Sequence, residues 1–434
     1  MDLNKIVDSY KNDMIKSVKE LISIPSVKGE PLEGKPFGKE IDRALRYTLE
    51  LGHKLGFSTG NVDGYAGYIE FGRGEETFGI LAHLDVVPEG GDWTYPPFGG
   101  EIHDGKIYGR GAIDDKGPAL AALYAMKAVM DAGVPVNKKV RLILGTDEES
   151  GWADMDYYFK DQPMPDFGTT PDAGYPVIHA EKGVAHIDLE KEFGDGGKDS
   201  FISSINGGSR ANMVPDFCTG ILKDGESLST DGVSAHGSMP EKGVNAISKM
   251  LKDLADRGLG DNPVDRFIAD LHNLIGFDTT GESLGINFSD DVSGSLTLNL
   301  GIIHIDGESG KAVLDIRYPV TYSHEQVLGG IQKALEGTGI DAKILSGHLP
   351  LHVPKDHFLV QTLNKVYKEQ TGQEFEPVAI GGGTYARALK TGVAFGPVFP
   401  GKAMLAHQKD EYIEIEDLIL NAKIYAHAIA ELVK

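Results

Sequence analysis

The sequence predicts an α/β protein in which a doubly wound mixed sheet is interrupted by an inserted α+β domain. Strand-like and helix-like segments alternate up to about residue 182, which is typical of a largely parallel sheet with helices on both faces. Polar residues collect where these strands end, as expected at the carboxyl edge of such a sheet. The pattern changes at residue 183 and returns near residue 352, so the middle of the chain is predicted to be an insertion.

The elements of the first part are predicted from hydrophobic spacing and from residues that end helices or strands. Apolar residues recur at helical intervals before Ile24-Pro25-Ser26, and an apolar run that starts at Phe78 is stopped by Pro88. Gly133 follows an alanine-rich segment, as is typical of a helix end. We expect, in chain order, helix 2–22, helix 38–55, strands near 57–62 and 65–71, strand 78–88, helix 118–132 and strand 140–145.

The rest of the chain is predicted in the same way. Strand-like and helix-like runs mix over about 170 residues before the earlier alternation resumes. We expect strands at 184–190, 296–304, 311–318 and 341–346, and helices at 243–257, 263–275 and 323–336. A helix near 355–370, a glycine-rich turn at 381–387 and a last helix near 416–432 complete the prediction.

Composition restricts the class of protein. The 434 residues are 41% hydrophobic and 25% charged, which is typical of a globular protein of two or three domains. A formal charge of −23 argues against nucleic acid and anionic membranes as partners. Cys218 is the single cysteine, which fits a reducing compartment. With no signal-peptide pattern and no apolar run of membrane-spanning length, we expect a cytoplasmic protein.

Two histidines and four carboxylates fall at predicted strand ends. They are His83, Asp114, Glu148, Glu149, Asp172 and His407. Imidazole and carboxylate groups suit a pair of borderline divalent ions, Zn²⁺ first and Mn²⁺ or Co²⁺ next. Because side chains alternate along a strand, Asp85 is expected on the same face as His83.

Each of these residues also has a purely structural interpretation. A core histidine could hydrogen-bond a neighbouring acid, and the acids could cap a helix, occupy a solvated turn or form an Asx-turn. The core-histidine alternative concerns His83, and the helix cap concerns Asp114–Asp115. The solvated turn concerns Glu148–Glu149, and the Asx-turn concerns Asp172. The occurrence of all six candidates at strand ends favours the metal site.

Four motifs carry a resemblance to a known family. They are His83-Leu-Asp85-Val-Val-Pro, Gly109-Arg-Gly-Ala-Ile-Asp114-Asp-Lys-Gly117, Thr146-Asp-Glu148-Glu149-Ser-Gly and the late His407. Through them the chain resembles the co-catalytic metallopeptidases that include aminoacylase, carboxypeptidase G and succinyl-diaminopimelate desuccinylase. Pro171-Asp172-Ala173, the loop from Gly381 to Arg387 and the long insertion are similar to the PepV-type dipeptidases of that family. The resemblance extends from the first helix to the last.

The resemblance implies a set of metal ligands. His83 and Asp172 would bind one divalent ion, and Glu149 and His407 would bind the other. Asp114 would bridge the two ions. The resemblance also implies that the peptide bond after Asp114 is cis.

The resemblance implies three further catalytic roles. Asp85 would hydrogen-bond the imidazole of His83 and fix its tautomer. Glu148 would be the general base that takes a proton from water held between the ions and passes it to the leaving amine. His236 would face the oxyanion, with a lid-surface histidine as the alternative interpretation.

Candidate substrate-binding residues lie in the insertion and in the glycine-rich turn. Asn212 and Arg317 are candidates for holding the substrate carboxylate, although Arg317 could instead form a strand-edge ion pair. The turn offers backbone N–H groups for the same purpose. Its candidate residues are Gly382, Thr384 and Arg387.

We therefore expect a catalytic domain in two parts, 1–182 and 352–434, and a lid domain at 183–351. The expected activity is that of a metal-dependent dipeptidase acting on short unblocked peptides. One alternative is an amide hydrolase or carboxypeptidase acting on N-acyl amino acids, and another is an inactive, metal-stabilised binding protein. The insertion is long enough to occupy the place of a partner subunit, so we expect a monomer, with a dimer as the alternative.

Overall fold

The computed structural model describes residues 2–434, apart from the side chain of Lys198. The chain divides into two compact units. Unit 1 comprises the residues up to 179 together with 352–378 and 384–434. Unit 2 comprises residues 180–351 and 379–383. No helix within residues 2–434 is both long and apolar enough to cross a membrane.

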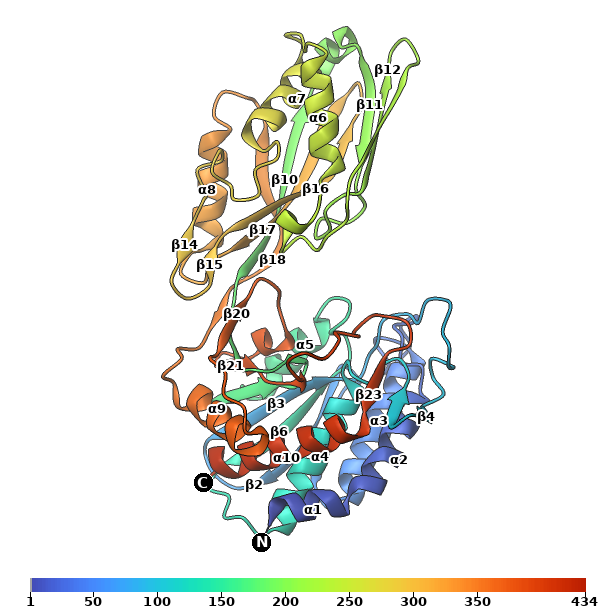
Figure 1. Cartoon of the computed structure of the whole chain (residues 1–434), viewed down its shortest axis with the longest axis vertical. Helices are drawn as coiled ribbons and strands as arrows, with labels where there is room; N and C mark the ends of the chain where they lie inside the picture. The colour runs from blue at the N-terminus through green and yellow to red at the C-terminus, as the bar shows by residue number, and fades with distance from the viewer. Residues whose placement is uncertain (1) are drawn as a thin grey trace. The chain divides into compact units, whose positions relative to one another are not determined.

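Most strands of a large mixed sheet belong to unit 1 (Figure 1). In spatial order the strands of this sheet are β1 (Ser58–Val62), β2 (Ala66–Gly72), β6 (Lys139–Gly145), β3 (Thr77–His83), β7 (Phe167–Thr170), β21 (Gly392–Ala394), β9 (Ile178–Glu181) and β19 (Leu351–His352), with β20 (Val378–Ile380) beside β9. Parts of β9, β19 and β20 belong to unit 2. The central strands β6, β3, β7 and β21 run parallel. Strand β2 pairs antiparallel with β6, and β1 pairs antiparallel with β2. The predicted α/β class with a mixed sheet is confirmed.

Helices cover both faces of this sheet, as the apolar central strands require. Ile80 and Ala82 of β3 pack in the larger core, whereas Leu81 packs in a separate core with Tyr158 and Tyr385. This alternation follows from the period of two along a strand. The helices of unit 1 are α1 (Leu3–Ser9), α2 (Lys11–Ile22), α3 (Lys39–Lys54), α4 (Lys116–Asp131), α5 (Ala153–Asp161), α9 (Phe358–Thr371) and α10 (Ile415–Leu432).

Two predicted elements differ from the structure. The helix predicted at 2–22 is two helices, because the backbone N–H of Tyr10 bonds Val7 and closes α1 in a tighter turn. The strand predicted at 78–88 ends at His83. Its neighbour β6 ends at Gly145, opposite His83, and the chain beyond continues in an isolated parallel bridge between Val86 and Val27.

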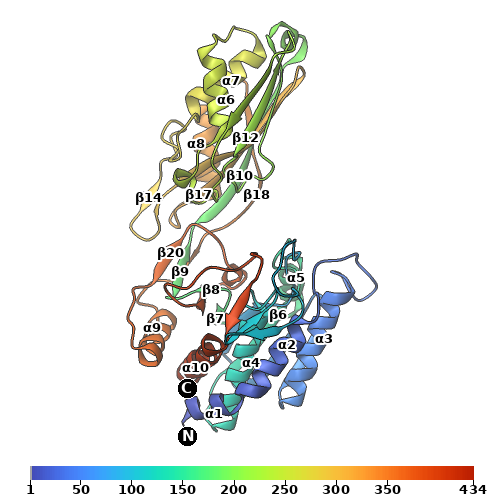
Figure 2. The ribbon, with the colours of Figure 1, turned by 45° about the vertical axis from the view of Figure 1, so that its right-hand side comes forward.

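Unit 2 is an antiparallel sheet with helices packed on one face (Figure 2). In spatial order its strands are β13 (Ser227–Asp231), β12 (Phe217–Leu222), β11 (Ile202–Gly207), β16 (Thr297–Ile305), β17 (Ser309–Tyr318), β10 (Gly183–Glu192) and β18 (Asp341–His348). Its helices are α6 (Ala246–Asp256), α7 (Pro263–Leu274) and α8 (His324–Ala334). Ala312, Leu314 and Ile316 of β17 face the core, which places Asp315 and Arg317 on the opposite face.

Short elements complete the chain. Near the carboxyl edge of the large sheet lie a small sheet of β4 (Glu101–His103), β5 (Lys106–Tyr108) and β23 (Tyr412–Glu414), and the paired strands β8 (Ala173–Gly174) and β22 (Pro397–Val398). The sequence did not predict these strands, because two- and three-residue strands carry too little periodicity. The short helix η3 (Tyr385–Ala388) occupies the predicted glycine-rich turn.

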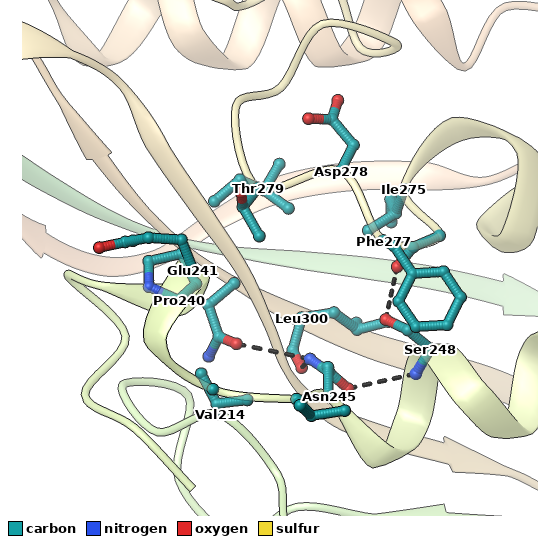
Figure 3. Close-up of a pocket in the computed structure, with 15 residues that line it drawn as sticks. Val214, Pro240, Glu241, Asn245, Ser248, Ile275, Phe277, Asp278, Thr279 and Leu300 are labelled. Atoms are coloured by element: carbon teal, nitrogen blue, oxygen red, sulfur yellow. Dashed lines mark hydrogen bonds between the residues drawn. The ribbon is translucent and has the colours of Figure 1, made fainter. Parts of the chain in front are cut away.

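A cavity of about 300 Å³ lies within unit 2, between the start of α6 and the loop around Phe277 (Figure 3). Asn245 caps α6 through its side-chain oxygen, and the hydroxyl of Ser248 bonds Gly276. These polar groups are therefore already satisfied by the protein itself. The predicted catalytic residues do not line this cavity.

Candidate metal centre

His83 is the last residue of β3, and its imidazole is fully buried. Its Nδ1 lies 3.0 Å from the backbone oxygen of Asp85. Because a carbonyl oxygen only accepts, Nδ1 carries the proton in the neutral ring. The other nitrogen, Nε2, lies 3.0 Å from Asp114 Oδ1 and 3.8 Å from Asp172 Oδ2. Nε2 is therefore the nitrogen available to a metal ion.

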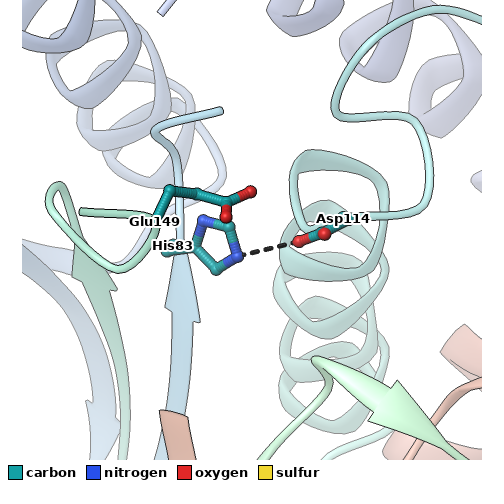
Figure 4. A group of neighbouring side chains, drawn as sticks. All are labelled: His83, Asp114 and Glu149. Carbon is teal, nitrogen blue, oxygen red and sulfur yellow. Dashed lines mark hydrogen bonds and ion pairs between the residues drawn. The ribbon is translucent and has the colours of Figure 1, made fainter. Parts of the chain in front are cut away.

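Asp114 lies between the two histidines. Its Oδ1 faces His83, as Figure 4 shows, and its Oδ2 is 3.3 Å from His407 Nε2. The same nitrogen of His407 is 2.9 Å from Glu149 Oε2. A carboxylate that faces a different imidazole with each oxygen has the arrangement that a bridging ligand requires.

The five predicted ligands come from five separate segments of unit 1. His83 ends β3, Asp114 precedes α4, Glu149 follows β6, Asp172 follows β7 and His407 precedes β23. Within residues 2–434, potential ligand atoms lie within 4.8 Å of one another in two groups, one of His83, Asp114 and Glu149 and one of His83, Glu148 and Asp172. Parallel strands end at the same edge of a sheet, which explains why distant segments meet here.

Asp85 contacts the imidazole of His83, as expected, but mainly through its backbone oxygen. The main acceptor for the His83 ring is the Asp85 backbone oxygen, and the carboxylate Oδ1 is 3.4 Å from Nδ1. The carboxylate also accepts the backbone N–H groups of Glu148 (3.2 Å) and Glu149 (3.1 Å). Asp85 thereby ties the end of β3 to the turn that follows β6.

The alternative in which Asp114 and Asp115 cap a helix does not hold for Asp115. Asp115 occupies the N-cap position of α4, but its side chain makes no capping bond. Instead, its Oδ2 accepts the backbone N–H of His83 at 3.2 Å. The peptide bond between Asp114 and Asp115 is cis, as the family resemblance implied.

Burial and neighbouring groups shift the pKa values of this cluster. Burial, and next the charge of Asp172, raises the pKa of Glu148 well above its usual value. Burial and the charge of Asp114 raise the pKa of Asp172 to about 6. Hydrogen bonds to Asp114 and Glu149 raise the pKa of His407 to about 10.

The donor set fits divalent metal ions. Imidazole nitrogens and carboxylate oxygens converge without a thiolate, which suits zinc, manganese or cobalt. A divalent cation offsets the burial and the neighbouring negative charges that raise the pKa values of Glu148 and Asp172, because it favours the charged form of each carboxylate.

The residues predicted in the insertion lie in unit 2. Arg317 is buried in β17, with its Nε and Nη2 each 2.8 Å from a different oxygen of Asp315, so its ion pair lies within the sheet and not at an edge. Its Nη1 donates to Gly381 at 3.5 Å. His236 is exposed and lies in the loop whose Gly237 N–H donates to the backbone oxygen of Asn212.

The glycine-rich turn spans both units. Gly382 belongs to unit 2, and Thr384 and Arg387 belong to unit 1. Thr384 caps η3 by accepting the backbone N–H of Ala386. Tyr385 packs edge-on against the His83 ring and donates a hydrogen bond to the buried carboxylate of Asp154.

Several polar residues around the cluster were missed by sequence reasoning. They are Arg110, Asp154, Tyr385 and Glu411. Arg110 and Glu411 each lie within four residues of a predicted ligand, and Tyr385 lies in the predicted glycine-rich turn, so their sequence positions were the available signal.

Comparisons with known proteins show the family of this chain. The model of the peptidase family M20/M25/M40 matches residues 79–431. The Bacillus subtilis protein named "Putative dipeptidase YtjP" is 43% identical, with 98% of each chain covered, and a Staphylococcus aureus protein also named a "Putative dipeptidase" is 37% identical over the same share.

Solved structures share the fold. Human carnosine dipeptidase 1 has a TM-score of 0.61 at 16% identity, covering 99% of this chain and 98% of the other. The aminoacylhistidine dipeptidase of Vibrio alginolyticus has a TM-score of 0.61 at 16% identity, covering 96% of each chain. Since the family model matches most of the chain and the relatives cover nearly all of it, the protein belongs to peptidase family M20/M25/M40.

Proposed function

We propose that this protein is a dinuclear metallopeptidase that hydrolyses short unblocked peptides, principally dipeptides. The observation that carries the proposal is the position of Asp114, whose two oxygens face His83 at 3.0 Å and His407 at 3.3 Å. The names of the two relatives described above support dipeptides as substrates. The single cysteine supports a cytoplasmic location.

Five residues would hold two divalent ions, for which Zn²⁺ is our first choice and Mn²⁺ or Co²⁺ the alternatives. His83 and Asp172 would hold one ion, and Glu149 and His407 would hold the other. Asp114 would hold both ions. When bound, such ions supply Lewis-acid activation of the attacking water and of the scissile carbonyl.

Glu148 would move the proton. Its carboxylate is partly buried next to Asp172, and its pKa is raised by burial first and by the charge of that neighbour second. A base with a raised pKa can take a proton from water and later return it to the leaving amine near neutral pH. Its backbone N–H is held by Asp85, which keeps the residue at the end of β6.

We propose that the region 183–351 acts as a lid and supplies the groups that recognise substrate. Asp315 holds two nitrogens of Arg317, so the guanidinium has a fixed orientation in which it could receive a carboxylate. His236 would donate to the oxyanion. Asn212 and the turn at Gly382, Thr384 and Arg387 would complete the contacts to substrate.

A substrate panel tests the proposal. Metal-reconstituted protein should cleave dipeptides with free ends well, tripeptides poorly, and N-acetylated or amidated dipeptides hardly at all. Ninhydrin or mass-spectrometric detection of released amino acids gives the rates. Preferential cleavage of N-acyl amino acids would instead identify an amide hydrolase, and no cleavage by protein loaded with two ions would reject the proposal.

A further inference from the structure

A buried ion pair connects two segments that carry proposed metal ligands, although neither member is itself a ligand. Arg110 is 2% exposed and Glu411 is fully buried, and Arg110 Nη1 lies 2.7 Å from Glu411 Oε2. Removing two charges from water is costly unless their hydrogen bonds are well satisfied, so the remaining contacts of this pair are informative.

Glu411 holds the backbone that presents Asp114. Its second oxygen, Oε1, accepts the backbone N–H of Ile113 at 2.9 Å and that of Asp114 at 3.2 Å. The backbone oxygen of Glu411 also accepts the N–H of Gly109 at 2.9 Å. Glu411 therefore accepts hydrogen bonds from three residues of the Asp114 loop.

Arg110 holds the loop that presents His407. Besides its bond to Glu411, Nη1 donates to the backbone oxygen of Gln408 at 3.2 Å. Gln408 is the residue directly after His407. Nη2 lies 3.4 Å from the backbone oxygen of Glu89, and the guanidinium packs over the Trp93 ring at 5.2 Å. These contacts give the guanidinium little freedom to move.

We propose that Arg110 and Glu411 are positioning residues that set the separation between Asp114 and His407. Glu411 contacts the loop that carries Asp114, and Arg110 contacts the loop that carries His407. The ion pair between Arg110 and Glu411 couples the positions of the two loops. The inference rests on the proposed dinuclear centre. Groups that orient metal ligands typically contribute 10- to 100-fold to metal affinity.

The contacts to the His407 loop and the contacts to the Asp114 loop can be removed separately. Arg110→Met removes the hold on the His407 loop but leaves Glu411 bonded to the Asp114 loop. Glu411→Gln retains an oxygen that can accept from Ile113 and Asp114, but it loses the charge that binds Arg110. Glu411→Ala removes both the ion pair with Arg110 and the side-chain hydrogen bonds to the Asp114 loop.

The experiment is titration of metal-free protein with Zn²⁺ followed by calorimetry, and with Co²⁺ followed by visible absorption. Wild type should bind two ions. Arg110→Met and Glu411→Gln should keep the first ion and bind the second 10- to 100-fold more weakly, because only His407 is displaced. Glu411→Ala should weaken both ions, since both depend on Asp114.

Arg141→Met is the matched control. Arg141 forms another largely buried arginine–glutamate pair in unit 1, with its Nη2 2.7 Å from Glu70, and contacts none of the proposed ligands. This variant should bind both ions with unchanged affinity even if its thermal stability falls. Thermal unfolding of each metal-free variant shows whether it is folded before titration.

Three results would overturn the inference. These are wild-type affinity for both ions in folded Arg110→Met, equal losses in Arg110→Met and Arg141→Met, or a wild type that binds fewer than two ions. A wild type that binds two ions but cleaves no peptide would reject the proposed function alone, and the loss of the second ion in the variants would still support the positioning role.

Discussion

His236 receives two hydrogen bonds from Ser238 at the same ring nitrogen. The backbone N–H of Ser238 lies 3.2 Å from Nδ1, and its hydroxyl oxygen lies 2.7 Å from Nδ1. Because a backbone N–H only donates, Nδ1 accepts, and the neutral ring carries its proton on Nε2. Although the residue as a whole is exposed, partial burial of its ring and next the charge of Arg317 lower the pKa of His236 and favour this neutral form.

We therefore predict that His236 is an Nε2–H tautomer at pH 7.5. Nitrogen chemical shifts of the histidine-labelled protein measure the tautomer directly, with His236→Gln used to assign the signal. Ser238→Ala retains the backbone donor but loses the hydroxyl, so it should show a mixture of tautomers and a turnover lowered by severalfold. A predominant Nδ1–H form in the wild type would contradict the prediction.

Glu148→Gln should separate the base from the ligands. The amide is nearly isosteric but cannot accept the proton, so we expect turnover to fall by about 10²- to 10⁴-fold while both ions remain bound. His407→Ala should instead lose one ion. Elemental analysis alongside steady-state kinetics distinguishes the two variants, and near wild-type turnover by Glu148→Gln would refute its role.

Metal removal should destabilise unit 1. Without cations, the burial and the neighbouring negative charges that raise the pKa values of Glu148 and Asp172 are not offset. An ion supplied at 100 times its dissociation constant stabilises the folded state by about 2.7 kcal/mol. Calorimetric scans with chelator, and again after Zn²⁺ is restored, should show a reversible fall in melting temperature. An unchanged melting temperature would argue against ion binding by the folded protein.

Asp154 should make stability fall as pH rises from about 4 to 6. Burial raises its pKa from 3.8 to about 6, against opposing hydrogen bonds from Tyr385 and from backbone N–H groups. The folded protein therefore binds more protons than the unfolded chain in this interval, and ionisation costs about 3 kcal/mol.

Urea unfolding at pH 4.5 and 6.5 tests this effect. The wild type should lose more stability between these values than Asp154→Asn, whose amide does not ionise. Other titrating groups act equally in both proteins, so the difference between the two slopes isolates Asp154. Parallel slopes would show that Asp154 titrates at its ordinary pKa.

Cys218 should resist thiol reagents until unit 2 unfolds. Burial raises its pKa to about 12, so at pH 8 only about one thiol in 10⁴ is ionised. Because it is the single cysteine, the reaction with Ellman's reagent reports one site. We expect negligible release of the chromophore from native protein and one equivalent in denaturant. Rapid native labelling would show that unit 2 opens readily.

The sequence by itself determined the local elements and the identity of the polar groups. The apolar run before His83 and the run before Gly145 form adjacent parallel strands, and the alternation of side chains along β17 separates Leu314 from Asp315. These properties depend on nearest neighbours and on burial, so a single sequence displays them. The placing of candidate ligands at strand ends follows from the same patterns.

The tertiary structure alone decided which of these groups meet and at which atoms. Strand β3 ends at His83 because β6 ends opposite it, and this puts the Asp85 backbone oxygen, rather than its carboxylate, nearest to the ring. Arg110 and Glu411 pair across 301 positions of chain. Local preferences contain no information about such distant partners, because their contacts form only when the ends of separate strands pack together at one edge of the sheet.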